Sequence, residues 1–387
     1  MKRTDAIQVI KKLMSYAVEH DASDIFISVD FPPAVKIDGK IKPVNHTPLN
    51  LADARQLVMS VMRDRHLKEF DANKECNFAI SPNEGGRFRV NAYIQRGCPA
   101  MVLRRISTHP PTLEELKLPE ILKDIAMTKR GLVMVVGATG SGKSTTLAAM
   151  IDYRNEHSHG HIITLEDPIE FVHAHKGCLV SQREVGVDTE DWEIALKNTL
   201  RQAPDVILLG EIRDRETMDQ AIQIAETGHL ALATIHANNA NQVLDRIINF
   251  FPQDRREQLL LDLSLNLRAI ISQRLMPRQD GHGRAAAIEI LLNTPLISDF
   301  ISENEVEKIK EIMERSRDEG MQTFDQALFD LYEANVITRE AALKNADSTN
   351  DLRYRIKLNS VRFKNEQPPD MGPGFKIEEE DQKYDRH

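Results

Sequence analysis

Residues 132–144 decide the fold of this 387-residue chain: Leu132-Val133-Met134-Val135-Val136 runs directly into Gly137-Ala138-Thr139-Gly140-Ser141-Gly142-Lys143-Ser144. The first five residues are all apolar, and a short apolar run of this kind predicts a buried strand. The next eight match the pattern G-x-x-x-x-G-K-[ST] at every position. Apolar residues follow at Leu147, Met150 and Ile151, which is the spacing of one helix face. The stretch therefore predicts a strand, a glycine-rich loop and a helix in succession.

The glycine-rich loop has the chemistry of a phosphate-binding site. Backbone N–H groups of such a loop converge on phosphate oxygens at the N-terminus of the following helix. We expect Lys143 to reach the β- and γ-phosphates of ATP and the Ser144 hydroxyl to bind Mg²⁺. The residues predicted to contact the nucleotide are Gly137, Ala138, Thr139, Gly140, Ser141, Gly142, Lys143, Ser144 and Thr145. The alternative, a glycine turn with a purely structural role, is disfavoured by the strand and helix on either side.

Three further apolar runs alternate with helical sequence: Ile162–Leu165, Val206–Leu209 and Leu230–Ile235. Runs that are apolar on both faces and separated by helices predict a parallel sheet covered on both sides, so the fold class is α/β. Beyond Phe251 we expect mainly helical structure.

The sequence before this region predicts a separate small domain of the α+β type. Apolar residues at helical spacing open it, and alternating strand patterns follow, with Asp38-Gly39 as a hairpin turn. We place this domain at residues 1–106 and a proline-containing linker at 107–111. Thr112 and Glu115 have the spacing of a capping box and predict a new helix at the start of the second domain, residues 112–347. Residues 348–387 are polar and rich in proline, glycine and acidic side chains, and are expected to form a mobile tail.

Composition limits the classes of function. A formal net charge of -9 disfavours a general nucleic-acid binder and favours protein partners. No apolar run approaches the roughly 20 residues of a membrane-spanning helix, and no secretory signal is evident, so a cytoplasmic location is expected. Cys76, Cys98 and Cys178 are far apart and contain no C-x-x-C pair, which argues against a disulfide framework or a zinc site.

Acidic residues follow two of the apolar runs. Ile162–Leu165 leads into Glu166, Asp167 and Glu170, and Val206–Leu209 leads into Gly210 and Glu211. Ligands bind beyond the C-terminal ends of strands in α/β sheets, so these carboxylates are expected at the rim of the nucleotide site. We assign Glu211 to the Mg²⁺ and water side of the site. One of the three acids at 166–170 is expected to activate water, and spacing alone does not choose among them.

Basic residues and one histidine complete the set of candidates. His236 follows the fourth apolar run and either senses the γ-phosphate or is an ordinary structural histidine. Arg213 lies two residues after Glu211 and is a candidate for contacting the nucleotide. Arg104 and Arg105 belong to an arginine cluster at the end of the first domain. Such arginines either are solvated or ion-paired surface residues, or offer charge to the phosphates across a domain or subunit contact.

Together these motifs resemble the secretion ATPases of type II secretion and type IV pili, and within them the twitching-motility branch of PilT and PilU. The resemblance rests on the loop Gly137–Ser144, the acidic box Glu166-Asp167-Pro168-Ile169-Glu170, the stretch from Leu208 to Asp214, and the surroundings of His236. It covers nearly the whole chain except the tail. It implies a PAS-like N-terminal domain, a RecA-like core and a homohexameric ring. It also implies that Glu170 is the catalytic acid and that His236 is functional.

Two departures from the family pattern favour the PilU branch. Pilus-extension and type II secretion relatives commonly carry a four-cysteine metal module, and no paired cysteines occur here. Motors of the PilT kind carry Ala-Ile-Arg-Asn-Leu, whereas the matching stretch is Leu296-Ile297-Ser298-Asp299-Phe300. The resemblance therefore implies an accessory ATPase that assists pilus retraction, with a PilT-like ATPase and an inner-membrane platform protein as partners.

Two other classes of function remain open at this point. A nucleotide-binding structural partner would contribute surfaces to another ATPase ring with little turnover of its own. A DNA-translocating or conjugation ATPase would use a similar core.

Overall fold

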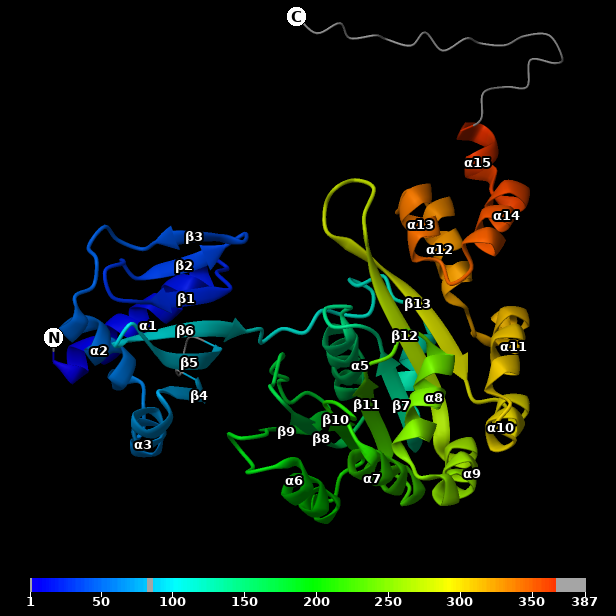
Figure 1. Cartoon of the computed structure of the whole chain (residues 1–387), viewed down its shortest axis with the longest axis horizontal. Helices are drawn as coiled ribbons and strands as arrows, with labels where there is room; N and C mark the ends of the chain where they lie inside the picture. The colour runs from blue at the N-terminus through cyan, green and yellow to red at the C-terminus, as the bar shows by residue number, and fades with distance from the viewer. Residues whose placement is uncertain (1, 82–85, 367–387) are drawn as a thin grey trace, which may run out of the picture. The chain divides into compact units, whose positions relative to one another are not determined.

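The computed structural model describes residues 2–81 and 86–366 (Figure 1). The chain forms two compact units. The first comprises Met1–Arg274 and Ile288–Gln322, and the second comprises Leu275–Ala287 and the chain from Thr323 onward. Within the described ranges, no helix is long and apolar enough to cross a membrane.

An antiparallel six-stranded sheet forms the N-terminal part of the first unit, in the order β3-β2-β1-β6-β5-β4. Its strands are β1 (Asp24–Ile27), β2 (Ala34–Ile37), β3 (Lys40–Pro43), β4 (Glu75–Ile80), β5 (Arg87–Gln95) and β6 (Cys98–Ile106), and its helices are α1 (Arg3–Glu19), α2 (Leu51–Ser60) and α3 (Asp64–Asn73). Ile10, Met14, Phe78 and Phe88 are buried in its core. This N-terminal part therefore combines an antiparallel sheet with helices, as the sequence patterns predict.

The predicted turn at Asp38-Gly39 is confirmed. Both residues have positive φ, 51° and 75°, and they connect β2 to β3 with Ile37 paired to Lys40. Two-residue hairpin turns with positive φ at both positions match the twist of the flanking strands, which explains the preference for Asp-Gly.

The predicted helix after the linker is wrong in position, although its capping box forms. Thr112 N–H donates to Glu115 Oε2 at 2.8 Å, and Glu115 N–H donates to Thr112 Oγ1 at 3.1 Å. The chain then makes only a turn, because Lys117 adopts a left-handed φ of 53° and Pro119 follows. The first helix of this region, α4, covers Ile121–Ala126 instead.

A seven-stranded sheet forms the second part of the first unit, in the order β13-β12-β7-β11-β10-β8-β9. The four predicted runs become β7 (Gly131–Val136), β8 (Gly160–Glu166), β10 (Val206–Leu209) and β11 (Leu230–Ile235), and they pair in parallel in the order β7-β11-β10-β8. All residues of β7, β10 and β11 are buried, as expected for strands covered on both faces. The helices are α5 (Lys143–His157), α6 (Trp192–Thr199), α7 (Arg215–Glu226), α8 (Ala240–Phe250), α9 (Arg256–Asn266), α10 (Pro295–Ser302) and α11 (Ile309–Arg315).

Three strands of this sheet were not foreseen. They are β9 (Cys178–Glu184), β12 (Leu267–Pro277) and β13 (Arg284–Leu292), so the expectation of mainly helical structure beyond Phe251 is wrong for the last two. Strand β12 lies parallel to β7, and Figure 1 shows β13 returning beside it as a hairpin. Each of these two strands contains short unbroken apolar runs, 269–271 in β12 and 285–288 in β13. Such short runs cannot be distinguished from buried helix by periodicity.

The stretch that replaces the PilT-type motif forms most of α10. Thr294 caps this helix, and Ile297 is buried on its inner side. Ser298 Oγ donates to the carbonyl oxygen of Ser264 at 2.8 Å, while Leu296 is 46% exposed. Of the altered residues, Ser298 therefore holds α10 against the end of α9, and Leu296 lies at the surface.

The second unit contains α12 (Phe324–Glu333), α13 (Arg339–Asn345), α14 (Thr349–Asn359) and α15 (Val361–Glu366). The expectation of a mobile tail from Ser348 is wrong for 349–366. Leu352 and Ile356, four residues apart on α14, are buried against a core that includes Tyr332, and this short apolar stripe stabilises the helix. The remainder of that expected tail lies outside the described residues.

Candidate active site

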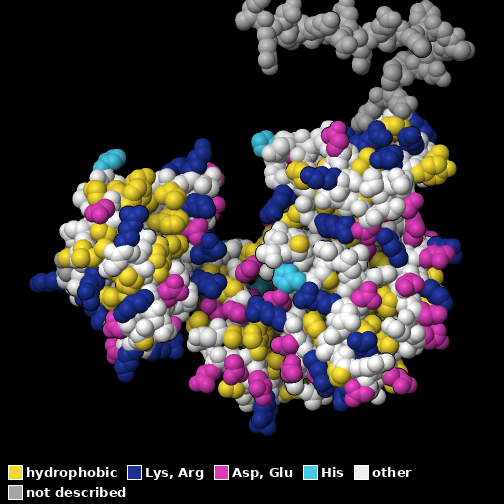
Figure 2. All heavy atoms as spheres, in the orientation of Figure 1, with side chains coloured by type: hydrophobic (Ala, Val, Ile, Leu, Met, Phe, Trp, Pro, Cys, Tyr) yellow, Lys and Arg dark blue, Asp and Glu magenta, His cyan; other side chains and the backbone are white. Residues whose placement is uncertain are grey.

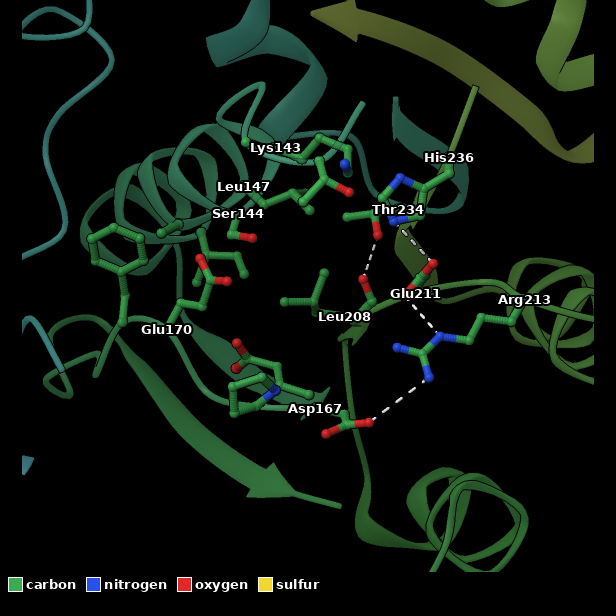
Figure 3. A pocket seen from close by; sticks show the side chains of 18 of the residues that line it. Lys143, Ser144, Leu147, Asp167, Glu170, Leu208, Glu211, Arg213, Thr234 and His236 are labelled. Carbon is green, nitrogen blue, oxygen red and sulfur yellow. Dashed lines mark hydrogen bonds and ion pairs between the residues drawn. The ribbon is translucent and has the colours of Figure 1, made fainter. Parts of the chain in front are cut away.

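A cavity of about 210 Å³ lies at the C-terminal ends of β7, β8, β10 and β11 (Figure 3). This is the edge at which parallel α/β sheets bind ligands. Eight of the predicted site residues line it: Thr139, Gly140, Lys143, Ser144, Glu170, Glu211, Arg213 and His236. The fold thus brings together residues that are up to 97 positions apart, from Thr139 to His236.

The glycine-rich loop forms one wall of the cavity, and its glycines are required by the backbone. Gly137 has a φ of 154°, and a Cβ atom there would lie 2.3 Å from Ser141 Oγ and 2.6 Å from the Gln273 carbonyl oxygen. Gly142 has a φ of 91° at the N-cap of α5. The first turn of α5 therefore presents backbone N–H groups that have no partner within the helix, which is the arrangement that binds phosphate.

Lys143 folds back over this loop. Its Nζ donates to the carbonyl oxygens of Gly137 and Ala138 at 2.8 and 3.0 Å. Burial lowers the pKa of Lys143, and the negative charges of Glu211 and Glu170 oppose that shift. The ammonium group is thus held close to both carboxylates on the opposite walls of the cavity.

Glu211 is the centre of a charged network at the end of β10. Its Oε1 lies 3.1 Å from His236 Nε2, and its Oε2 accepts a hydrogen bond of 2.7 Å from Arg213 Nε. The Arg213 guanidinium also lies 3.9 Å from an Asp167 carboxylate oxygen (Figure 3). Thr234 Oγ1 on β11 donates to the carbonyl oxygen of Gly210, which fixes the backbone immediately before Glu211. His236 is therefore joined to the predicted metal-side acid by direct contact.

The three acids at the end of β8 and in the loop after it differ in their surroundings. Glu166 accepts hydrogen bonds from Thr164 Oγ1 at 2.6 Å and Gln182 Nε2 at 3.2 Å. Burial raises the pKa of Glu166. Asp167 is exposed and pairs with Arg213. Glu170 is also exposed, and Figure 3 shows its side chain pointing toward Ser144. Glu166 thus braces the loop from inside, and Glu170 presents its carboxylate to the cavity.

Several further residues that line the cavity, most of them apolar, were not predicted. They include Leu147, Phe171 and Trp192 together with His173. Burial lowers the pKa of His173 to about 4, so the ring is neutral, and its Nδ1 is buried without a hydrogen-bond partner. No motif identified these residues, because they reach the cavity from separate elements. Trp192 is the single tryptophan of the chain.

Arg104 and Arg105 do not line this cavity. They lie on β6 of the N-terminal sheet, where Arg104 pairs with Asp24 at 2.9 Å and Arg105 pairs with Asp21 at 2.7 Å. A role for these arginines toward a nucleotide held by another subunit stays a prediction.

On the face drawn in Figure 2, basic and acidic side chains are interspersed.

In the part of the chain that the structure describes, no group of three or more His, Cys, Asp or Glu could by itself hold a metal ion. Mg²⁺ in nucleotide sites is commonly held by one or two protein oxygens together with phosphates and water. Ser144 and Glu211 both line the cavity and fit that donor set.

Comparison with known proteins places these features in a family. The family model for Type II/IV secretion system protein matches residues 2–365. The chain is 61% identical to the type IV pilus ATPase PilU of Pseudomonas aeruginosa over 350 residues, covering 90% of this chain and 92% of that protein. It is 41% identical to the type IV pilus retraction ATPase PilT of the same organism, covering 87% and 98%. The crystal structure of the pilus retraction motor PilT with bound ADP superposes with a TM-score of 0.82 at 41% identity, covering 89% of this chain and 98% of that one.

Proposed function

Because this chain belongs to the type II/IV secretion system protein family and is a PilU-type type IV pilus ATPase, we propose that it is a hexameric, Mg²⁺-dependent motor that assists pilus retraction in twitching motility. One observation carries the proposal. The phosphate loop with Lys143, four acidic side chains, Arg213 and His236 meet in one cavity at the ends of four parallel strands. Hydrolysis of a phosphoanhydride needs these groups together: a phosphate cradle, a base for water and positive charge for the transition state.

ATP is the proposed nucleotide, and the related PilT crystal structure holds ADP. Its phosphates would accept hydrogen bonds from the backbone of Gly137–Thr145 and from Lys143. Lys143 Nζ donates to the carbonyl oxygens of Gly137 and Ala138. Phosphate oxygens would take the place of these two carbonyl oxygens as its acceptors. A lysine already held at the loop loses little side-chain freedom when phosphate binds.

Glu170 is the proposed general base. Of the acids in and after the last residue of β8, it combines an exposed carboxylate with an orientation toward Ser144. Glu166 is unsuited to the role, because Thr164 and Gln182 already donate to its Oε1 and burial raises its pKa. A base must lie within hydrogen-bond reach of the water it activates, and Glu170 is the acid placed to do so.

Glu211 and Ser144 are proposed to hold Mg²⁺, which supplies charge to offset the negative charge of the phosphates. His236 contacts Glu211 directly and is proposed to orient its carboxylate. Arg213, which contacts the other oxygen, is proposed to neutralise it in the absence of nucleotide.

The domain boundaries of the resemblance are also proposed here. All strands of the antiparallel sheet lie before residue 107, and those of the core sheet lie within 131–292, which supports a division at the linker 107–111. We assign the antiparallel part to the PAS-like class and the core to the RecA-like class. In a hexamer of such subunits, Arg104 and Arg105 would act on a neighbouring subunit's nucleotide.

A PilT-like ATPase and an inner-membrane platform protein are the proposed partners, and the motor would act in the cytoplasm at that membrane. The stretch Leu296–Phe300, which lacks the arginine and asparagine of PilT-type motors, supports an accessory role. The test of this role measures ATP hydrolysis and assembly mass with and without a PilT-like partner. A rate unchanged by the partner would contradict it.

The central test is Mg²⁺-ATP turnover by the purified chain, with nucleotide binding followed by the fluorescence of Trp192. We expect Lys143→Ala to abolish both binding and turnover, and Glu211→Ala to abolish turnover. Lys129→Ala, an exposed lysine outside the cavity, is the matched control and should behave as the wild type. Ring assembly without turnover, alone or with a PilT-like partner, would instead support a purely structural partner.

Supply of arginine between subunits has its own test. Rings that mix Arg104→Ala or Arg105→Ala subunits with Lys143→Ala subunits should recover activity beyond either variant alone. Absence of such recovery would remove the support for action in trans.

A further inference from the structure

Strand β9 carries a side chain that contacts the acidic loop at three points. Gln182 Nε2 donates to Glu166 Oε1 at 3.2 Å and to the carbonyl oxygen of Phe171 at 2.8 Å. Gln182 Oε1 accepts a hydrogen bond of 2.8 Å from the backbone N–H of His173. A single half-buried amide therefore holds both ends of the segment from Glu166 to His173.

Glu170 lies inside this segment. On its N-terminal side, Glu166 accepts a hydrogen bond from Gln182. On its C-terminal side the next residue, Phe171, is bonded to Gln182 directly. One residue on β9 therefore holds the chain on both sides of Glu170.

The placement of Gln182 follows from the sheet and is rigid. Strands β8 and β9 are parallel, with Thr164 paired to Gln182 and Glu166 paired to Glu184. A side chain on a regular strand is held more precisely than one on a loop, and catalytic groups depend on such support.

We propose that Gln182 is a positioning residue for Glu170, the proposed general base. The proposal rests on the ATPase function proposed above. Gln182 does not touch the nucleotide site itself, since it is absent from the lining of the cavity. It acts by holding the loop that carries the base.

The chemistry requires an amide at this position. Phe171 and Glu166 present oxygen acceptors, and His173 presents an N–H donor, so the side chain must supply two donors and one acceptor. Glutamine does so, whereas an ionised glutamate offers acceptors only. A carboxylate in place of Nε2 would also face Glu166 Oε1, which disfavours ionisation of the pair.

The experiment compares Gln182→Glu with a matched change at the far end of the same loop. Asn155 Nδ2 donates to the carbonyl oxygen of Ala174 at 2.7 Å, and its Oδ1 accepts from the backbone N–H groups of Lys176 and Cys178 at 3.1 and 3.3 Å. Asn155→Asp therefore removes the same kind of donor from a buried amide that braces the loop but does not flank Glu170.

We expect Gln182→Glu to lower kcat for ATP about 100-fold, the cost of misplacing a catalytic group by roughly 1 Å. The KM for ATP and the Trp192 fluorescence change on binding ADP should stay within about threefold of the wild type, because the phosphate loop is untouched. The deficit should shrink as the pH falls, since a protonated Glu at 182 regains a donor. Asn155→Asp should lower thermal stability yet keep kcat within about threefold.

Three results would overturn the inference while leaving the ATPase function intact: wild-type kcat in Gln182→Glu, equal loss of kcat in both variants, or a deficit that does not depend on pH. Hydrogen exchange tests the same idea without turnover. Backbone amides of 167–172 should exchange faster in Gln182→Glu than in Asn155→Asp, and equal protection would overturn the inference even if no turnover is found. Lack of turnover in the wild type, with or without a PilT-like partner, would instead count against the proposed function.

Discussion

The phosphate loop and the acidic loop face each other across one cavity, yet different forces hold them in shape. The phosphate loop, 137–145, owes its geometry to its own backbone: Gly137 and Gly142 adopt φ values that other residues rarely take. The acidic loop, 166–173, owes its geometry chiefly to Gln182, a side chain on the neighbouring strand β9.

The difference bears on how each loop tolerates change. A locally encoded loop fails when its own residues change, whereas a loop held by tertiary hydrogen bonds also fails when a distant partner changes. The acidic loop therefore carries the base on a support that other parts of the fold can weaken.

The largest effect is expected from the acidic loop. Glu170→Gln removes the proposed base while keeping the shape of the side chain, so turnover should fall about 1,000-fold. That factor corresponds to roughly 4 kcal/mol of transition-state free energy. Steady-state ATPase assays measure the loss, and Trp192 fluorescence should show nucleotide binding unchanged. Wild-type turnover in Glu170→Gln would show that another acid is the general base.

Adding a single methyl group to the phosphate loop at Gly137 should destabilise the protein. Gly137→Ala places a Cβ 2.3 Å from Ser141 Oγ and 2.6 Å from a backbone oxygen, at a φ of 154°. We expect a loss of about 3 kcal/mol in the free energy of unfolding, together with loss of nucleotide binding. Gly140→Ala is the matched control, since nothing lies within 4 Å of its added Cβ at a φ of 76°. It should cost about 1 kcal/mol by denaturant unfolding, and equal losses would refute local crowding as the cause.

A pH-dependent effect is expected at Glu166, because burial raises its pKa in the folded state. The folded chain then binds this proton more tightly than the unfolded chain, whose glutamate pKa is about 4.3. Its contribution to stability falls as the pH rises from that value through the raised pKa, and then levels off. The stability of Glu166→Gln relative to the wild type should therefore increase over the same range. A difference that is flat from pH 4 to 8, measured by urea unfolding, would show that Glu166 titrates normally.

The smallest effect is expected at Asp167, in the same loop. Its pairing with Arg213 spans 3.9 Å between side chains that are 41% and 54% exposed. Exposed pairs contribute about 0–1 kcal/mol, so Asp167→Asn should change the free energy of unfolding by less than about 0.5 kcal/mol. Turnover should stay within about threefold, in contrast to Glu170→Gln. A large loss of turnover would mean that the two exposed acids share the role of base.

Several parts of the fold could be predicted because their signals are local. The apolar runs that become β7, β8, β10 and β11 are bounded by helices, and their parallel pairing follows from that alternation. Strands β12 and β13 were not predicted, since the short apolar runs that they contain are also compatible with a buried helix. The helices at 349–366 were not predicted, because the segment is mainly polar and, of its described side chains, only two apolar ones, Leu352 and Ile356, are buried in the core.

The sequence by itself determined the phosphate loop, because the glycine pattern dictates backbone conformation within eight residues and needs no distant partner. It also indicated that the acids at 166–170, Glu211 and His236 lie near that loop, since they follow or end strands of one sheet. The structure was needed to separate Arg213, which lines the cavity, from Arg104 and Arg105. Only the tertiary structure distinguished Glu166 from Glu170. The burial of Glu166 and its bond from Gln182, sixteen positions away, depend on how β8 and β9 pair, and no spacing within the acidic box records that contact.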